Sequence, residues 1–212
     1  MGYAILAFDG ADPSRRAAVR EAHLAVITRW AAEGRLALGT PLFNTAFQPV
    51  GSLMVLNVPD ETHLKEYIQD EPFAHEGVWA RFDAHPFRIA PLPYRPLPGP
   101  GAPVSASRTH TVTLAWDGTD TDAPARRAAA RPAHVERIEA FAADGTLVLG
   151  GALLDAQGAM RGSITVTAHA TDAAAEAFWE ADPYMQAGVW QRVQRWGTRL
   201  VGLPYQALPG AA

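Results

Sequence analysis

The sequence predicts an α+β protein in which two ferredoxin-like domains, each with the element order βαββαβ, pack together as an intramolecular pseudo-dimer. The first observation behind this prediction is a repeat. RRAAVREAH at residues 15–23 recurs as RRAAARPAH at 126–134, an offset of 126 − 15 = 111. The offset holds without a gap from Arg15 to Gly99, and about a third of the paired positions are identical. Each unit therefore has the size of an ordinary domain.

The second observation is the order of the elements within the first repeat. An apolar run at 3–8 that ends in Asp9-Gly10 predicts a strand followed by a turn. A helix over about 14–33 comes next, with Ser14 as its candidate N-cap and Gly34 as its stop. The remaining elements are two strands, a short helix, a proline break and a last strand, at 35–39, 51–57, about 60–69, Pro72 and from Trp79 onward.

The third observation is that the second repeat predicts the same elements. They are a strand, a long helix, a second helix, a proline break and a last strand, at 111–116, about 124–144, about 171–181, Pro183 and from Trp190 onward. Both helices of a βαββαβ unit cover one face of its antiparallel sheet, so the other face needs a cover. The second copy can supply that cover by packing sheet on sheet.

The domain boundaries follow from the segment between the repeats. Residues 91–110 are rich in proline and glycine and show no periodicity, which is typical of a linker. PLPY at 91–94 nevertheless recurs as GLPY after the second repeat, so the start of this segment belongs to a domain. We therefore predict domains at 1–99 and 110–212, joined by a linker at 100–109.

Composition and charge exclude several classes of protein. The formal net charge of −4 gives no electrostatic footprint for nucleic acid. Basic residues cluster only as Arg15-Arg16 and Arg126-Arg127, which we interpret as solvated helix faces. With no cysteine, the chain has no disulfide, thiolate nucleophile or cysteine zinc site.

Localisation, metals and cofactors are constrained in the same way. No run approaches the length of a membrane-spanning helix, and the first residues lack the basic start and apolar stretch of a signal peptide. We therefore expect a cytoplasmic protein without membrane contact. The seven histidines show no metal-ligand spacing, and no phosphate-binding or dinucleotide-binding glycine motif follows a strand. We expect neither a metal nor a cofactor.

The candidate catalytic residues are polar residues that recur in both repeats. His23 and His134 follow Arg-X-Ala on the first helix of each repeat, and an imidazole can take up and return a proton near neutral pH. A carboxylate is needed to orient such a base, and Asp182 and its counterpart Glu71 each precede a proline after the second helix. Structural roles, a satisfied helix histidine and a helix-ending Asp-Pro, remain open alternatives.

Further recurring residues are candidates for substrate binding or for the core. Arg20 and Arg131 lie three residues before the histidines and so share their helix face; they could bind an anion or form a structural ion pair. Ser52 and Ser163 could donate a hydrogen bond to a ligand or start a strand. The recurring large aromatics are expected in the core: Trp79, Trp190, Tyr94 and Tyr205.

Taken jointly, these motifs resemble the YCII-related (YciI-like) family. The second repeat shows RPAH at 131–134, GTLVLGGA at 145–152, GS at 162–163 and ADPYMQAGVW at 181–190. The first repeat shows the matching motifs REAH, GRLALGTP, GS and DEPFAHEGVW, at 20–23, 34–41, 51–52 and 70–79. The likeness covers nearly the whole chain, twice.

The resemblance implies a dimeric α+β barrel, with the tandem chain standing for a fused dimer. It also implies an active site built on a His–Asp pair, which maps onto His134 with Asp182 and onto His23 with Glu71. The one well-described activity of the family removes HCl from a chlorinated hydroxyquinol without a cofactor. Repeat 1 departs from the family pattern at Glu71 and Thr40, and repeat 2 departs at Ala152.

We therefore expect a cofactor-free enzyme of the lyase or isomerase type, acting by acid–base chemistry on a small, aromatic or polyketide-like molecule. Alternatives are a cofactor-free oxygenase of an electron-rich phenol and a non-catalytic ligand-binding protein. Repeat 2 is predicted to be the more active half, because Glu71 shifts its carboxylate by one methylene. The expected partners are a small-molecule substrate and the other repeat, and a further homodimer is left open.

Overall fold

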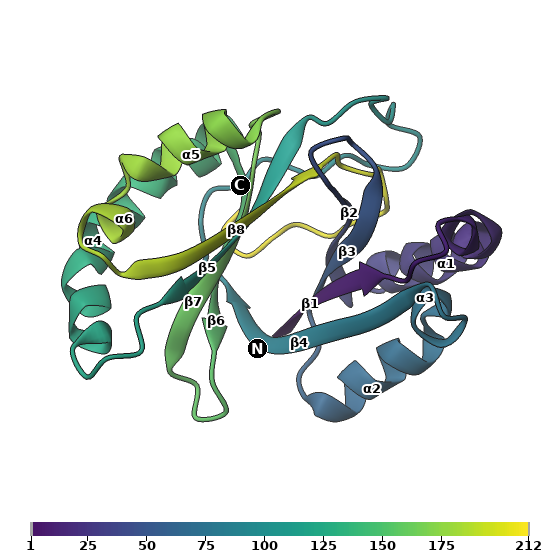
Figure 1. Cartoon of the computed structure of the whole chain (residues 1–212), viewed down its shortest axis with the longest axis horizontal. Coiled ribbons are helices and arrows are strands. Elements are labelled where there is room, and N and C mark those ends of the chain that lie inside the picture. The colour runs from purple at the N-terminus through teal and green to yellow at the C-terminus, as the bar shows by residue number, and fades with distance from the viewer. Residues whose placement is uncertain (1, 212) are drawn as a thin grey trace.

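The computed structural model describes residues 2–211, and the predicted element order is present twice (Figure 1). Repeat 1 contains β1 (Gly2–Asp9), α1 (Ser14–Ala32), β2 (Leu36–Phe43), β3 (Pro49–Leu56), α2 (Glu61–Asp70), α3 (Pro72–His75) and β4 (Trp79–Ile89). Repeat 2 contains β5 (His110–Asp117), α4 (Ala123–Asp144), β6 (Leu147–Leu154), β7 (Met160–Thr167), α5 (Asp172–Glu180), α6 (Pro183–Gln186) and β8 (Trp190–Thr198).

Two local features differ from the prediction. Ser14 is the first residue of α1 rather than its cap, and its backbone N–H and hydroxyl both donate to the Asp12 carboxylate. The chain after each proline break also forms a one-turn helix, α3 or α6, where only a break was predicted. The capping side chains of these short helices are Glu71 and Asp182, each of which accepts from a backbone N–H two residues later.

The eight strands form one closed antiparallel barrel in the order β1-β3-β2-β8-β5-β7-β6-β4. Within each repeat the sheet order is that of a ferredoxin-like unit. The repeats meet where β4 pairs with β6, through Phe87, Arg88 and Ile89, and where β2 pairs with β8. The predicted pseudo-dimer is therefore present, and its two sheets also join at their edges, which leaves neither sheet with an open edge strand.

The barrel interior holds the core that both repeats share. Alternate residues of a strand face opposite sides of the sheet. Ala4 and Leu6 of β1 belong to the same buried cluster as Val112 and Leu114 of β5, whereas Ile5 packs in the cluster beneath the helices of repeat 1. Figure 1 shows the helices of the two repeats on opposite outer sides of the barrel. The sheet face that the helices of each repeat leave uncovered is thus buried against the sheet of the other repeat.

The segment that follows each repeat crosses to the other one. The Tyr94 hydroxyl donates to the carbonyl of Gly150 in β6 and accepts from the Gly150 N–H, at 3.0 and 3.1 Å. The Tyr205 hydroxyl makes the same pair of bonds with Gly39 in β2, at 3.1 and 3.2 Å. PLPY and GLPY therefore recur because each one ties its own repeat to the opposite sheet. Tyr94 is fully buried and Tyr205 partly so.

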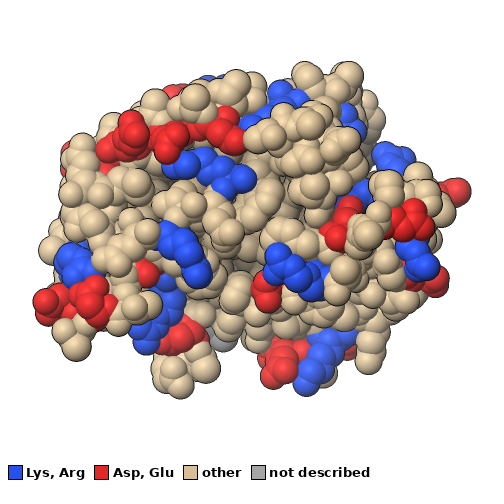
Figure 2. All heavy atoms as spheres, in the orientation of Figure 1, with Lys and Arg blue, Asp and Glu red and all other residues tan. Residues whose placement is uncertain are grey.

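Charged side chains of both signs lie on the face of the molecule shown in Figure 2. Acidic side chains form a row at the upper left of this face, with basic side chains directly below it, and elsewhere on the face the two kinds lie close together. Within residues 2–211, no helix combines the length and apolar character that crossing a bilayer requires.

Candidate active sites of the two repeats

The structure brings His134 and Asp182 together, although 48 residues separate them in the sequence. His134 Nδ1 lies 2.8 Å from Asp182 Oδ1. The Asp182 side chain is fully buried and His134 is 8% exposed. The imidazole stacks on the Tyr184 ring, with 3.8 Å between the ring centroids. A buried carboxylate on Nδ1 leaves Nε2 as the nitrogen that can exchange a proton with a ligand.

Local structure explains this meeting. His134 lies on α4, which packs against α6 and β6, and its ring faces Tyr184 of α6. Asp182 lies between α5 and α6, and its Oδ1 accepts a hydrogen bond from the backbone N–H of Tyr184 at 2.9 Å. The aspartate is thus the N-cap of α6 and the partner of the histidine at once, so the structural and functional interpretations of Asp182 are compatible.

Repeat 1 forms the same pair with a longer acid. His23 Nδ1 lies 2.7 Å from Glu71 Oε1, His23 is also 8% exposed and Glu71 is fully buried. The imidazole stacks on Phe73 at 3.9 Å, as His134 does on Tyr184. The additional methylene of Glu71 therefore does not move its hydrogen-bonding oxygen away from the imidazole, and the two repeats match in this distance.

The second carboxylate oxygen is satisfied differently in the two repeats. In repeat 2, Arg137 donates to Asp182 Oδ2 at 3.2 Å. Position 137 corresponds to Val26 in repeat 1, which cannot do this, and there the Tyr67 hydroxyl donates to Glu71 Oε2 at 2.8 Å instead. Burial raises the pKa of Tyr67 well above its ordinary value, so the phenol keeps the proton that it donates.

The interpretation of both arginine pairs as solvated helix faces is wrong for Arg16 and Arg127. Arg127 is buried, binds both oxygens of Asp117 at 2.7 and 2.9 Å, and donates to the Ser163 hydroxyl at 3.1 Å. Arg16 binds Asp9 and donates to the Ser52 hydroxyl at 2.8 Å in the same way. Arg15 is exposed and Arg126 partly so, as predicted.

The predicted substrate-binding residues lie at the cavities. Arg20 and Arg131 are exposed, and each lines the same cavity as the histidine one turn further along its helix. Within residues 2–211, neither guanidinium has a hydrogen-bond or ion-pair partner, so neither forms the alternative structural ion pair. Ser52 and Ser163 are buried in the cavity walls and bonded to Arg16 and Arg127.

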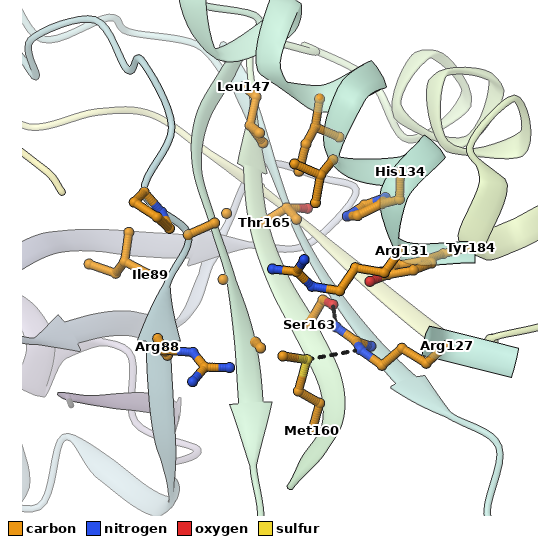
Figure 3. Close-up of a pocket in the computed structure, with 17 residues that line it drawn as sticks. Arg88, Ile89, Arg127, Arg131, His134, Leu147, Met160, Ser163, Thr165 and Tyr184 are labelled. Atoms are coloured by element: carbon orange, nitrogen blue, oxygen red, sulfur yellow. Dashed lines mark hydrogen bonds between the residues drawn. The ribbon is translucent and has the colours of Figure 1, made fainter. Parts of the chain in front are cut away.

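Each cavity is completed by the other repeat. Arg88, at the end of β4 in repeat 1, lines the cavity of His134, opposite Arg131 and His134 in Figure 3. Arg199, just after β8 in repeat 2, lines the cavity of His23. Sequence reasoning missed both residues, although 199 − 88 = 111 and they therefore recur at the repeat offset.

The two cavities differ in size. The cavity of His23 measures about 420 Å³, and that of His134 about 90 Å³. In repeat 2 the Met160 sulfur accepts from Arg127 at 3.3 Å within the cavity wall, as Figure 3 shows. Among the described residues that line either cavity, none is acidic, and three arginines line each one.

Fold and site together define the class. An eight-stranded barrel closed by two ferredoxin-like halves, with a His–carboxylate pair beneath the first helix of each half, is a dimeric α+β barrel in a single chain. The YCII-related domain model matches residues 1–88 and 111–196. The chain therefore belongs to the YCII-related family, as a tandem duplication.

Solved structures agree on the fold. A candidate monooxygenase from Lactobacillus acidophilus NCFM superposes over 96% of each chain with a TM-score of 0.60 and 9% identity. An anthrone oxidase-like protein matches over 100% of this chain and 97% of its own, with a TM-score of 0.51 and 14% identity. At such identities the likeness shows the fold alone.

One weaker match covers a single repeat's length. The 5-chloro-2-hydroxyhydroquinone dehydrochlorinase of Burkholderia phenoliruptrix AC1100 covers 42% of this chain and 96% of its own, with a TM-score of 0.39 and 17% identity. No curated protein matches the chain. Within residues 2–211, no three histidine, aspartate or glutamate side chains gather as a metal site.

Proposed function

We propose that the protein is a cofactor-free enzyme that performs acid–base chemistry, such as elimination, isomerisation or cyclisation, on a small aromatic or polyketide-like molecule. The observation that carries this proposal is the buried His–carboxylate pair, formed in both repeats at 2.7 and 2.8 Å, with each imidazole at a cavity wall. A pair that served the fold alone would not need to place its histidine beside a cavity in both copies.

The proposed chemistry follows from the orientation of the imidazole. The carboxylate accepts the Nδ1 proton and fixes the tautomer in which Nε2 carries a lone pair. Nε2 then takes a proton from the substrate, and the buried carboxylate balances the charge of the imidazolium. In this scheme the histidine of the repeat that binds the substrate, His23 or His134, moves the proton, and its carboxylate partner, Glu71 or Asp182, positions it. The arginine of the same repeat, Arg20 or Arg131, would bind a substrate oxygen beside the proton that moves.

Ser52 and Ser163 would donate a hydrogen bond to the substrate from the cavity wall, and an arginine orients each of them. Each hydroxyl already accepts from Arg16 or Arg127, so its own proton is free to be donated toward a substrate oxygen. The arginine thereby orients the serine, and the Asp9 or Asp117 carboxylate orients the arginine.

Proton exchange tests the proposal at its first chemical step, whichever reaction follows. The protein is incubated in D₂O with a panel of small phenols and enolisable acids, and loss of C–H signal is followed by NMR. We expect exchange with the native chain and none above background with a double variant His23→Gln, His134→Gln. Asp182→Asn with Glu71→Gln should retain the fold and lose about 10²–10⁴ of the rate, the usual contribution of an oriented base. Exchange that persists in the His double variant would refute the proposal.

A second candidate function shares the first step. Deprotonation of an electron-rich phenol by the same histidine would also prepare it for reaction with oxygen, and this fits the structural likeness to a candidate monooxygenase and an anthrone oxidase-like protein. Oxygen consumption during the panel experiment distinguishes it from elimination or isomerisation. A chain that binds panel members, with no exchange and no oxygen uptake, would instead be a ligand-binding protein.

A further inference from the structure

We propose that the ligand binds in the cavity of repeat 1 alone, and that this cavity selects a planar aromatic anion. The anion would be held by Arg199, which comes from repeat 2, and the ring by Phe43 and Phe47. This inference rests on the proposed function, since it names the substrate class of that site. It also places the ligand in the half that the sequence had suggested to be the less active one.

Cavity volume separates the two repeats. Small-molecule sites measure roughly 300–1,000 Å³, and an engineered cavity of about 150 Å³ binds benzene. The cavity of His23, at about 420 Å³, falls within this range, whereas that of His134, at about 90 Å³, is smaller than both volumes. Both have the His–carboxylate pair, so volume rather than the pair decides which site admits a ligand.

The loop between β2 and β3 provides an aromatic wall in repeat 1 only. Phe43 and Phe47 stack with 4.2 Å between ring centroids, and both line the cavity. Their counterparts at the 111-residue offset are Leu154 and Gly158, and neither of these lines the cavity of His134. Phe73, on which His23 stacks, closes another side of the same cavity.

Phe47 occupies a backbone position that suits glycine. Its φ of 57° lies in the left-handed region, and Gly158 in the equivalent loop has φ of 82°. Asn44 and Asp155 shape the two loops alike, each accepting from backbone N–H groups two and four residues later. A residue with a Cβ is disfavoured there, and such strain points to a role for the side chain itself.

The charge for an anion comes from arginines without acidic partners. Arg199 donates to the carbonyl of Ser105 at 2.6 Å, and its Nε is buried without a hydrogen-bond partner in residues 2–211. Its guanidinium lies 5.4 Å from the Phe43 ring centroid and 5.6 Å from that of Phe47. Arg20 lines the same cavity and is also unpaired, whereas Arg16 is neutralised by Asp9. An oxyanion beside Arg199 would satisfy the buried Nε.

The experiment is calorimetric titration of the full chain with 2-naphthoate, 2-naphthamide and cyclohexanecarboxylate, which vary the charge and the ring separately. We expect 2-naphthoate to bind with one molecule per chain and more tightly than either of the others. Arg199→Met should weaken its binding about tenfold to a hundredfold, which is what a hydrogen bond to a charged group contributes. Phe47→Gly should weaken it about threefold to tenfold without lowering the melting temperature, because the glycine relieves the backbone.

The matched control is Arg88→Met, the equivalent change at the cavity of His134, which should leave 2-naphthoate binding unchanged. Two molecules per chain, an equal loss in Arg88→Met, equal binding of the amide or no binding of 2-naphthoate would each overturn the inference. Calorimetric titration measures binding and does not require the protein to catalyse a reaction. Binding through Arg199 without proton exchange would therefore refute the proposed function alone, and exchange without this binding pattern would refute the inference alone.

Discussion

At the residue scale, each buried carboxylate has a partner for both of its oxygens. Asp182 contacts His134 and Arg137, and Glu71 contacts His23 and Tyr67. A buried acceptor left without its donor costs about 1–3 kcal/mol. Repeat 2 uses Arg137 as the second donor, and repeat 1, which has Val26 at that position, uses Tyr67 where repeat 2 has Phe178. These differences compensate one another, because each repeat keeps one donor for the second oxygen.

Replacing Tyr67 by phenylalanine tests this dependence. The variant removes the donor to Glu71 Oε2 and should lower the free energy of unfolding by about 1–3 kcal/mol, read from the urea midpoint. Phenylalanine itself fits, since Phe178 occupies the equivalent place in repeat 2. Adding Val26→Arg rebuilds the arrangement of repeat 2 and should recover part of the loss. A midpoint that Tyr67→Phe leaves unchanged would show that the second oxygen needs no donor.

At the element scale, the start of each last strand holds the short helix against the sheet. Trp190 opens β8 and lies 5.1 Å from the Trp179 ring of α5 and 5.5 Å from the Tyr184 ring of α6. It also meets the His134 ring edge-on at 5.8 Å. The burial expected for Trp79 and Trp190 is confirmed, because both are 4% exposed.

Trp190→Ala should therefore cost about 3–5 kcal/mol of the free energy of unfolding, the usual range for a large buried aromatic. The measurement is a denaturant titration followed by circular dichroism. Phe82→Ala serves as the control, because Phe82 is one of the exposed large apolar side chains and should matter little. Equal midpoints for the two variants would contradict the packing role of Trp190.

The sequence predicted the helices and strands more completely than it predicted the residues of the candidate active sites. Recurrence at the 111-residue offset identified both histidines and both carboxylates, because it filters out residues that only one copy needs. Arg88 and Arg199 also recur at this offset, but only the three-dimensional barrel shows that each lines a cavity. Arg16 and Arg127 were misjudged from their arginine neighbours, although helical spacing puts Arg16 on the face of Arg20 and His23.

Other parts of the site could not be read from the chain. Arg137 and Tyr67 do not recur at the 111-residue offset. Only the three-dimensional structure shows that both donate to the second oxygen of a buried carboxylate, Asp182 or Glu71. The predicted packing of sheet on sheet did not indicate that the edges would also pair, because edge pairing depends on the twist that two sheets accumulate. Cavity volume depends on the sum of many small side-chain differences, which no single motif records.

At the scale of the whole molecule, the tyrosines of the crossed segments make stability depend on pH. Burial raises the pKa of Tyr205 to about 12, and it raises the pKa of Tyr94 as well. The folded state therefore holds these protons more tightly than the unfolded chain, where a tyrosine titrates near 10. This stabilisation is complete below about pH 10 and is lost as the pH rises toward 12.

Urea midpoints measured at pH 8, 10 and 11.5 check the prediction. The native chain should lose stability over the last step, and a double variant Tyr94→Phe, Tyr205→Phe should start lower and lose less. The variant starts lower because the carbonyls of Gly39 and Gly150 lose a donor. Parallel curves for the two proteins would assign the alkaline loss to other groups.

A fragment of residues 1–100 tests the dependence of one repeat on the other. It lacks Tyr205 and β8, and it leaves the edges of β2 and β4 unpaired and the inner sheet face uncovered. We expect it to dimerise or aggregate, because an exposed edge and an apolar face both promote association. Sedimentation velocity gives the answer, and a stable monomeric fragment would contradict the interdependence of the repeats.

The exchange of arginines between the repeats has a consequence for how the protein responds to dilution. If the halves were separate chains, each cavity would lose the arginine that the other half supplies whenever the two chains dissociated. The fraction of complete sites would then fall as the protein was diluted. A covalent connection replaces that equilibrium with a fixed, high effective concentration of one half at the other. The number of complete sites per molecule is then the same at nanomolar as at millimolar protein, and it is independent of how much of the protein a cell makes.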